Sequence, residues 1–380
     1  MTTDDILNDE NLIEVTDEST VPIQVPFDPN LIRIRRDPFT LGELIDKIAH
    51  NEVNFFTLFQ RKSDLWSEGQ QSRLIESVLL RLPLPAFYFD EVTFESNDMF
   101  SSKVVWQVID GLQRCSALKN FAVDKKMKLS NLEFLHQFNE YGYDDLPRDL
   151  QRRISQTPIT VYVVEKGTPD VVKFNIFKRI NTEGLLLKPQ EIRHALNQGT
   201  PAKFVEELAE LDEFKRATQY SIKSNRMEDR DFTTRFVSFY LIPFTDYEPD
   251  LDSFMTKGMS SINGKSINEL TQIKQDFIAA METAIFIFGD DAFRKRQHID
   301  DRRKPINKAL FEVLSVSFAK LSDDKRNKLK NVADVFKRKF IELNNDNRFF
   351  YALSSGTGHK DNVKTRFTEI SRIIKETIDY

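Results

Sequence analysis

The sequence predicts an α+β protein, with a small mixed sheet in an N-terminal domain and an all-helical domain after it. Three runs rich in β-branched and aromatic residues are expected to form strands, and segments with helical periodicity separate them. These runs are 86–90, 103–109 and 159–164. After Pro201 strand signals almost vanish, while helical periodicity continues towards the C-terminus, so the helices form a layer or domain of their own.

The domain boundaries follow from this change of pattern. We expect domains at residues 29–200 and 201–380, preceded by an acidic tail at 1–28. The first thirty residues contain eight acidic side chains and neither Lys nor Arg, and the formal net charge of -5 becomes +3 when these eight acids are left out. Two interpretations of the tail stay open: a disordered solubilising segment, or a cover that lies over a basic groove and mimics nucleic acid.

The composition is that of a globular protein in a reducing compartment. Of the 380 residues 40% are hydrophobic, enough to bury a substantial core. The longest apolar runs, such as 284–288, are far too short to span a membrane, and the N-terminus is acidic where a signal peptide would be basic. The single cysteine, Cys115, excludes an intramolecular disulfide. We therefore expect a cytoplasmic protein without a membrane partner, in which Cys115 is either a packing residue or a reactive thiol.

Two amphipathic helices open the first domain. Apolar residues at helical spacing begin at Leu41, with Thr40 as the expected N-cap, and continue to Ile48. A second helix is expected over 68–81, and the prolines that follow it end the pattern.

Helical spacing also organises the second domain. Its apolar residues recur in six segments: 201–217, 228–243, 266–288, 307–321, 323–343 and 361–378. The stretch 247–265, with Pro249, Gly258 and Gly264, is expected to be a loop. The chain has 32 Phe, and their helical spacing favours a role in the core over base-stacking platforms.

The most informative motif follows the predicted strand 103–109. Asp110, Gly111, Gln113 and Arg114 lie between this strand and the start of a predicted helix. Backbone N–H groups at a helix start carry partial positive charge, glycine permits a close approach, and an arginine can fork onto phosphate oxygens. The motif predicts a phosphate-binding turn, and the alternative is an Asp-Gly turn in which Asp110 only caps the helix.

This motif resembles the Asp-Gly-Gln-Gln-Arg signature of the N-terminal domain of GmrSD-type restriction proteins, also called domain of unknown function 262. Three further blocks match in the family's order: Phe59-Gln60-Arg61 with Trp66; residues 71–80 with Leu82-Pro83-Leu84-Pro85; and residues 177–181 through Glu183-Gly184, Leu187 and 191–193. Two positions depart from the family. Leu112 stands where its first Gln is usual, and Cys115 where Leu is usual, so nucleotide binding is expected more firmly than hydrolysis.

The resemblance implies a fold like that of the ParB and sulfiredoxin superfamily, and a nucleoside triphosphate of unspecified base as the ligand. The catalytic candidates are then Asp110, Gln113 and Arg114. The candidate nucleotide contacts are Gln60, Arg61, Arg73, Gly111, Arg179 and Asn181, with Arg61 joining Arg114 around a phosphate. Asp110 is also the candidate ligand for Mg²⁺, which hydrolysis would require. Arg73 and Glu76 lie three residues apart on a helix, where they pair with each other or orient Arg61.

A basic stretch in the second domain is the candidate DNA-binding region. Residues 291–342 contain fifteen Lys or Arg and eight Asp or Glu. The candidate duplex contacts are Arg294, Lys295, Arg296, Arg302, Arg303 and Lys304. Solvated helix faces are the alternative. The stretch 352–366 resembles a phosphate-cradling loop before a helix and equally a capped loop.

The resemblance implies a nucleotide-binding, NTP-hydrolysing component of a DNA modification-dependent restriction or phage-defence system, which regulates DNA engagement or a partner nuclease. The sequence shows no Walker loop, dinucleotide fingerprint or zinc spacing, and no complete His-Asn-His nuclease motif, so cleavage is expected to need a separate subunit. Two other functions stay open: a non-catalytic DNA-binding or toxin-neutralising protein, and a ParB-like DNase with a metal on Asp110 and Glu76. Assembly into a homo-oligomer also stays open.

Overall fold

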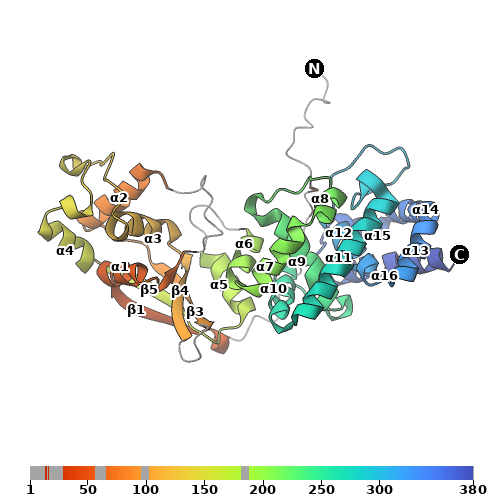
Figure 1. Cartoon of the computed structure of the whole chain (residues 1–380), viewed down its shortest axis with the longest axis horizontal. Helices are drawn as coiled ribbons and strands as arrows, with labels where there is room; N and C mark the ends of the chain where they lie inside the picture. The colour runs from red at the N-terminus through yellow and green to blue at the C-terminus, as the bar shows by residue number, and fades with distance from the viewer. Residues whose placement is uncertain are drawn as a thin grey trace, which may run out of the picture. The chain divides into compact units, whose positions relative to one another are not determined.

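The computed structural model describes residues 13, 14, 16, 29–55, 66–95, 102–180 and 188–379 (Figure 1). The chain divides into two compact units. The sheet unit comprises Phe27–Leu187, and the helical unit comprises Lys188–Tyr380 together with Met1–Pro26.

The division at Lys188 differs from the domain boundary expected at residue 201. Helix α6 (Pro189–Leu196) lies between these two positions, and it packs against α7, α9 and α10 of the helical unit. Its buried Arg193 pairs with Asp231 and Asp252 of that unit, which is a long-range contact that local periodicity does not indicate.

One mixed sheet is formed by the described strands, in the order β1-β5-β3-β4-β2. Their bounds are β1 Ile34–Thr40, β2 Val53–Asn54, β3 Phe87–Glu95, β4 Ser102–Asp110 and β5 Pro158–Val164. The pairs β1/β5 and β3/β4 are antiparallel, whereas β3/β5 and β2/β4 are parallel. With the helices that follow, this sheet confirms the predicted α+β class.

Two of the five strands were not expected from the sequence. β1 is an edge strand with three charged residues and Pro38. This composition suits an edge, because a proline cannot donate a backbone hydrogen bond and an edge strand has only one neighbouring strand to pair with. β2 has only two residues. Neither has the apolar alternation that identified β3, β4 and β5.

The sheet has two different faces because side chains alternate along each strand. Phe87, Phe89, Trp106 and Val108 belong to one buried cluster, which also contains residues of the helices α1 to α4. The helices of the sheet unit are α1 Leu41–Ala49, α2 Glu68–Leu79, α3 Leu112–Leu118, α4 Arg148–Gln156 and α5 Asp170–Ile180. Figure 1 shows α1 to α4 gathered on one side of the sheet and α5 on the other.

Capping boxes position the first two helices, and of the two caps Thr40 was expected from the sequence. Thr40 caps α1 in a capping box with Glu43, and Ser67 caps α2 in the same way with Gln70. Each box satisfies backbone N–H groups that a helix start leaves without a partner, so these helices begin where the sequence predicts.

The helical unit contains eleven described α-helices. They are α6 Pro189–Leu196, α7 Thr200–Glu210, α8 Asp212–Ala217, α9 Glu228–Leu241, α10 Leu251–Ser260, α11 Ile267–Phe288, α12 Lys308–Ala319, α13 Asp323–Asn331, α14 Ala333–Asn344, α15 Asn347–Ser354 and α16 Lys360–Ile378. No helix in the described part of the chain is both long and apolar enough to cross a membrane.

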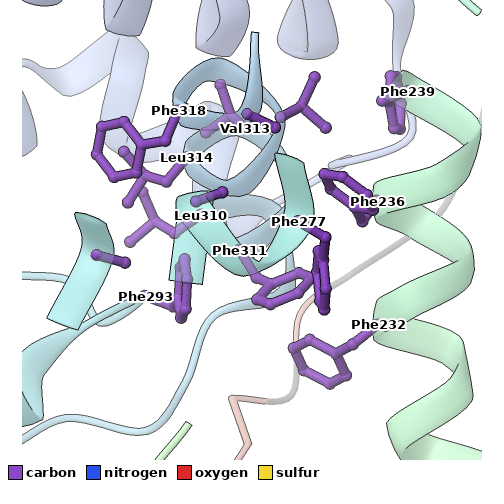
Figure 2. Close-up of a cluster of buried hydrophobic side chains, with 14 of the residues drawn as sticks. Phe232, Phe236, Phe239, Phe277, Phe293, Leu310, Phe311, Val313, Leu314 and Phe318 are labelled. Atoms are coloured by element: carbon purple, nitrogen blue, oxygen red, sulfur yellow. The ribbon is translucent and has the colours of Figure 1, made fainter. Parts of the chain in front are cut away.

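Phenylalanine forms much of the core of this unit. Figure 2 shows Phe232 and Phe236 of α9 facing Phe277 and Phe311. The ring centroids of Phe236 and Phe277 are 4.5 Å apart, and those of Phe232 and Phe311 are 5.0 Å apart. The rings are tilted or edge-on, the arrangements that aromatic quadrupoles favour, so these Phe side chains have the predicted core role.

The predicted loop at 247–265 is wrong, because α10 occupies most of it. Asp250 caps this helix, and Gly258 lies inside it. A Cβ at Gly258 would overlap the Ser238 hydroxyl of α9. Gly258 permits α9 and α10 to approach each other closely. In the sequence alone, the same glycine resembles a loop residue, which is why the helix was not predicted.

Candidate nucleotide site and the basic stretch

A β-bulge sets the direction of Asp110 at the end of β4. Phe89 lies opposite Val108, whereas the preceding Tyr88 lies opposite Asp110, so β4 has one extra residue, Ile109, at this point. Residues directly opposite each other share a face of the sheet. The bulge therefore turns Asp110 to the face of Tyr88, which is the face opposite the α1 to α4 core.

Gly111 follows with a left-handed backbone. Its φ of 98° favours glycine, and it occupies the N-cap position of α3. A Cβ at this position would lie 2.8 Å from the Phe87 ring. Both the conformation and the packing require glycine, so the Asp-Gly pair makes the abrupt change from strand to helix.

Arg114 faces inward and holds the turn together. Its Nη2 donates to Asp110 Oδ2 at 2.7 Å and to the Ala86 carbonyl at 3.1 Å, and Nη1 donates to the Pro85 carbonyl. The guanidinium lies 4.4 Å from the centroid of the Phe87 ring. The Arg114 side chain is 10% exposed, against 29% for Asp110. Arg114 is thus committed to intramolecular acceptors, and of the two side chains Asp110 is the more accessible.

Gln113 connects the turn to Trp66. The Gln113 Oε1 accepts from the Trp66 backbone N–H at 3.1 Å, and the Trp66 carbonyl accepts from Gln71 Nε2 at 2.9 Å. Asn120 in turn donates to Gln71 at 3.0 Å. Side-chain amides therefore hold both main-chain groups of Trp66. The structure brings Gln113 to Trp66, which ends the matching block that contains Gln60 and Arg61. Gln60 and Arg61 of that block lie outside the described residues.

The two departures from the family pattern are both packing positions. Leu112 packs against the core cluster of the sheet unit, and Cys115 is fully buried within it. Burial raises the pKa of the Cys115 thiol to about 12, so it stays protonated at neutral pH. Of the two roles considered for Cys115, the structure supports packing.

Arg73 and Glu76 do not pair with each other. Arg73 is exposed and lies 3.7 Å from Glu133. The buried Glu76 carboxylate accepts backbone N–H groups of Glu133, Phe134 and Leu135. Burial by itself would raise the pKa of Glu76, but these hydrogen bonds hold it below its ordinary value. Glu76 anchors a loop, and this commitment removes it as a metal ligand beside Asp110.

Helix α5 carries the next predicted contact and a pair that sequence reasoning missed. Arg179 is exposed in the last turn of α5, and Asn181 lies outside the described residues. Lys173 of the same helix lies 2.6 Å from the buried Asp90 of β3. Burial raises the pKa of Asp90 to about 6, against the opposing effect of Lys173. The polar Asp90 within the apolar strand 86–90 was the available signal.

Mg²⁺ fits Asp110 in chemical terms. Magnesium is commonly held by one or two carboxylates together with phosphate oxygens of the substrate, and a partly exposed carboxylate can serve as one such ligand. Among the described residues no three His, Cys, Asp or Glu side chains gather as a metal cluster.

The first basic cluster of the helical unit is mostly turned inward. Arg294 and Lys295 are buried, and Arg294 donates to main-chain carbonyls of Asp290 and Lys304. Arg296 is half-buried and pairs with Asp291. These cations satisfy acceptors within the protein, so as packed they do not present a row of charges to DNA.

The second basic cluster, Arg302 to Lys304, is more exposed than the first. Arg302 and Arg303 are exposed, while Lys304 is half-buried with Asp301 at 3.3 Å. In the predicted phosphate loop at 352–366, the buried Arg366 donates to the Ala352 and Thr357 carbonyls, so its guanidinium bonds to the loop's own backbone. Of the basic candidates, Arg302 and Arg303 have the exposure that phosphate contacts need.

Strand, glycine turn and helix define the class of this domain: an α+β domain with an acidic, amide-bearing turn at a strand end. Residues 41–198 match the family model of the GmrSD restriction endonuclease, N-terminal domain. Residues 41–198 are thus similar to this N-terminal domain, and the match associates the chain with restriction and defence systems. Neither a curated protein nor a solved structure matches the chain, and the likeness to ParB and sulfiredoxin stays a prediction.

Proposed function

We propose that the chain is the nucleotide-binding component of a restriction or phage-defence system. Its site would combine the turn Asp110–Arg114 with the segment that precedes Trp66. The observation that supports this best is the hydrogen bond from the Trp66 N–H to Gln113. It ties two blocks of the family pattern that are distant in sequence, and the block that ends at Trp66 contains Gln60 and Arg61.

Some residues of the proposed site would contact the ligand, and others would orient those residues. Asp110 would hold the magnesium that accompanies a nucleoside triphosphate, or position a water molecule. Arg114 would fix the direction of Asp110, because its guanidinium is bonded to that carboxylate and to the carbonyls before β3. Arg61 would then be the cation that faces the phosphates. Further contacts would come from Gln60, Arg73, Gly111, Arg179 and Asn181.

Binding is proposed more firmly than hydrolysis. The family's first glutamine is replaced by Leu112, whose side chain packs against the core and offers no amide to a water or a phosphate. If hydrolysis occurs, Asp110 and Gln113 are the polar groups of the turn that can act on the reacting water. The chain would bind nucleotide and bias DNA engagement or a partner nuclease.

Nucleotide titrations with magnesium test the proposal. The purified chain is titrated with ATP, GTP, CTP and UTP, and phosphate release is measured in parallel. We expect Arg61→Ala to weaken binding by about tenfold or more, since a charged hydrogen bond contributes roughly 1.5–3 kcal/mol. Arg148→Ala, which removes an exposed arginine of α4 that is not among the proposed contacts, is the matched control. Absence of binding with all four nucleotides, or equal binding by Arg61→Ala and wild type, would contradict the proposal.

The second candidate function is a non-catalytic DNA-binding or toxin-neutralising protein. The exposed Arg302 and Arg303 favour it, as does Leu112. Duplex binding is measured across a salt series, where each lost phosphate contact lowers the log–log salt slope by about 0.9. A double Arg302→Ala, Arg303→Ala variant should therefore have a slope smaller by about 2. An unchanged slope excludes these two contacts, and co-purification with a small RNase or a nuclease identifies the partner class.

A further inference from the structure

The N-terminal residues Ile13 and Glu14 dock on the helical unit. Ile13 forms a parallel β-bridge with Ile306 and packs against the core of the unit. The Glu14 N–H donates to the Ile306 carbonyl at 2.8 Å. Ile13 and Glu14, which are far away in sequence, are thus attached to the basic stretch at Ile306.

Glu14 places its carboxylate in a slot of buried donors. Its Oε1 lies 2.6 Å from Lys295 Nζ, and its Oε2 accepts from Asn307 Nδ2 at 3.0 Å. Lys295 also donates to Ser354 Oγ at 2.6 Å and lies 4.7 Å from the centroid of the Phe350 ring. Lys295 is 5% exposed and Asn307 is fully buried. The slot therefore offers the carboxylate an ammonium and an amide, and the Ser354 hydroxyl accepts from the same ammonium.

The donors of this slot are fixed by the helical unit itself. Asn307 donates to the Leu353 carbonyl and caps α12 by accepting from the Leu310 N–H, so its amide is oriented without Glu14. Ser354 ends α15 and donates to the Phe350 carbonyl. Glu14, in contrast, comes from the tail and is 27% exposed. The Asn307 amide is thus oriented by the helical unit itself, whereas the carboxylate comes from the N-terminal tail.

A buried ammonium strongly favours the presence of an anion. Removing one partner of a buried charge pair leaves an uncompensated charge, which is far costlier than the pair. Lys295 would retain a hydroxyl and an aromatic face when Glu14 leaves, and neither carries a formal charge. The buried Lys295 ammonium therefore still favours binding of an anion when the tail is displaced.

We propose that this slot binds a phosphate group, and that Glu14 occupies it as a displaceable carboxylate stand-in. Ammonium and amide donors suit phosphate oxygens. The exposed Arg302 and Arg303 lie in the chain between Lys295 and Asn307, and they add positive charge to the same loop. The tethered tail has a high effective concentration, so it would compete with an external phosphate. This site lies in the helical unit and is separate from the proposed nucleotide site.

Anion rescue of a tail variant tests the slot. Glu14→Ala removes the carboxylate, and Glu10→Ala is the control that removes one tail charge elsewhere. The melting temperature of each full-length protein is measured with inorganic phosphate and with chloride at equal ionic strength. We expect Glu14→Ala to melt lower than wild type in chloride and to gain more from phosphate than wild type or Glu10→Ala does.

A variant of Lys295 shows whether the phosphate effect depends on the buried ammonium. In the Glu14→Ala background, Lys295→Met removes the buried charge, so the double variant should lose the phosphate effect and regain part of the stability in chloride. Equal phosphate effects in wild type and Glu14→Ala overturn the proposal. So does a phosphate effect that survives Lys295→Met.

Duplex DNA and free phosphate are distinguished in a second measurement. A labelled duplex is titrated with wild type, Glu14→Ala and the double variant. If the phosphate comes from a nucleic acid backbone, Glu14→Ala should bind on the order of tenfold tighter, within the usual range for coupled sites, and the double variant should lose the gain. Phosphate rescue with unchanged duplex affinity assigns the slot to a small phosphate ester. Neither result depends on nucleotide binding in the sheet unit.

Discussion

Arg114 in the sheet unit and Lys295 in the helical unit are both buried cations within stretches that the sequence marks as phosphate-binding. Arg114 pairs with Asp110, four residues earlier, and with carbonyls just before β3. Lys295 pairs with Glu14, which is 281 residues away in the chain. The first cation takes its partners from the turn that holds it and from the residues just before β3, whereas the second depends on the N-terminal tail. Similar charge patterns can therefore belong to a permanent structural tie or to a replaceable contact.

The largest effect is expected from Arg114→Ala. Asp110 and two carbonyls would lose their donor, and because each hydrogen bond to a charged group contributes about 1.5–3 kcal/mol without adding fully, the total loss should be about 3–5 kcal/mol. Urea unfolding is followed by tryptophan fluorescence, because Trp66 and Trp106 both lie in the sheet unit. The exposed Arg73→Ala is the control. A loss below that of Glu14→Ala would break the comparison between the permanent and the replaceable cation.

Acid should weaken the helical unit through His194. Burial lowers the pKa of this buried histidine from 6.5 to about 4. A lowered folded-state pKa contributes stability above the unfolded pKa, and this stability is lost as the pH falls from 6.5 through about 4. The full contribution is about 3 kcal/mol. His194→Phe should flatten the pH dependence of unfolding measured by circular dichroism, and an unchanged slope would exclude the histidine as its source.

The sheet unit should respond to pH in the opposite direction through Asp90. Its folded-state pKa is raised from 3.8 to about 6 by burial, with Lys173 opposing the shift. The corresponding stability is present below pH 3.8 and is lost as the pH rises through about 6. Asp90→Asn should reduce this loss, by up to about 3 kcal/mol in tryptophan-monitored unfolding. If the variant and wild type keep the same difference at pH 4 and pH 7, the carboxyl does not titrate as stated.

A smaller loss is expected from Gly111→Ala. The residue would have a positive φ and its Cβ would press on the Phe87 ring, which together cost about 2 kcal/mol. Gly264→Ala is the control, because nothing lies within 4 Å of its added Cβ. The measurement is the urea midpoint of each variant. Equal midpoints for Gly111→Ala and wild type would show that the turn adapts without cost.

The smallest effect on stability is expected from Gln113→Ala. It removes one hydrogen bond to the Trp66 main chain, which contributes about 1 kcal/mol. If the turn and the segment before Trp66 form one site, the same variant should weaken nucleotide binding more than it lowers stability. Gln151→Ala, which removes a side chain bonded to the Tyr143 and Leu146 carbonyls, is a control of similar kind. Equal nucleotide affinity in the two variants would argue against a joint site.

Local patterns predicted much of the fold, and long-range burial explains the misses. Thr40 capped α1 as expected, and α2 begins at Glu68, the predicted start of the second helix. The predicted helix 323–343 is instead two helices, α13 and α14, which meet at Val332. β1 was missed because its pairing with β5, and not its charged composition, makes it a strand. α10 was missed because Gly258 serves contact with α9.

For the candidate site, the sequence by itself determined the turn: the order of Asp110, Gly111, Gln113 and Arg114 between a strand and a helix requires only local backbone preferences. Tertiary structure decided what each side chain does. It turned Arg114 inward, joined Gln113 to Trp66, and placed Glu14 on Lys295. The physical reason is that propensities act over a few residues, whereas a buried charge or amide takes whichever partner the folded chain brings to it.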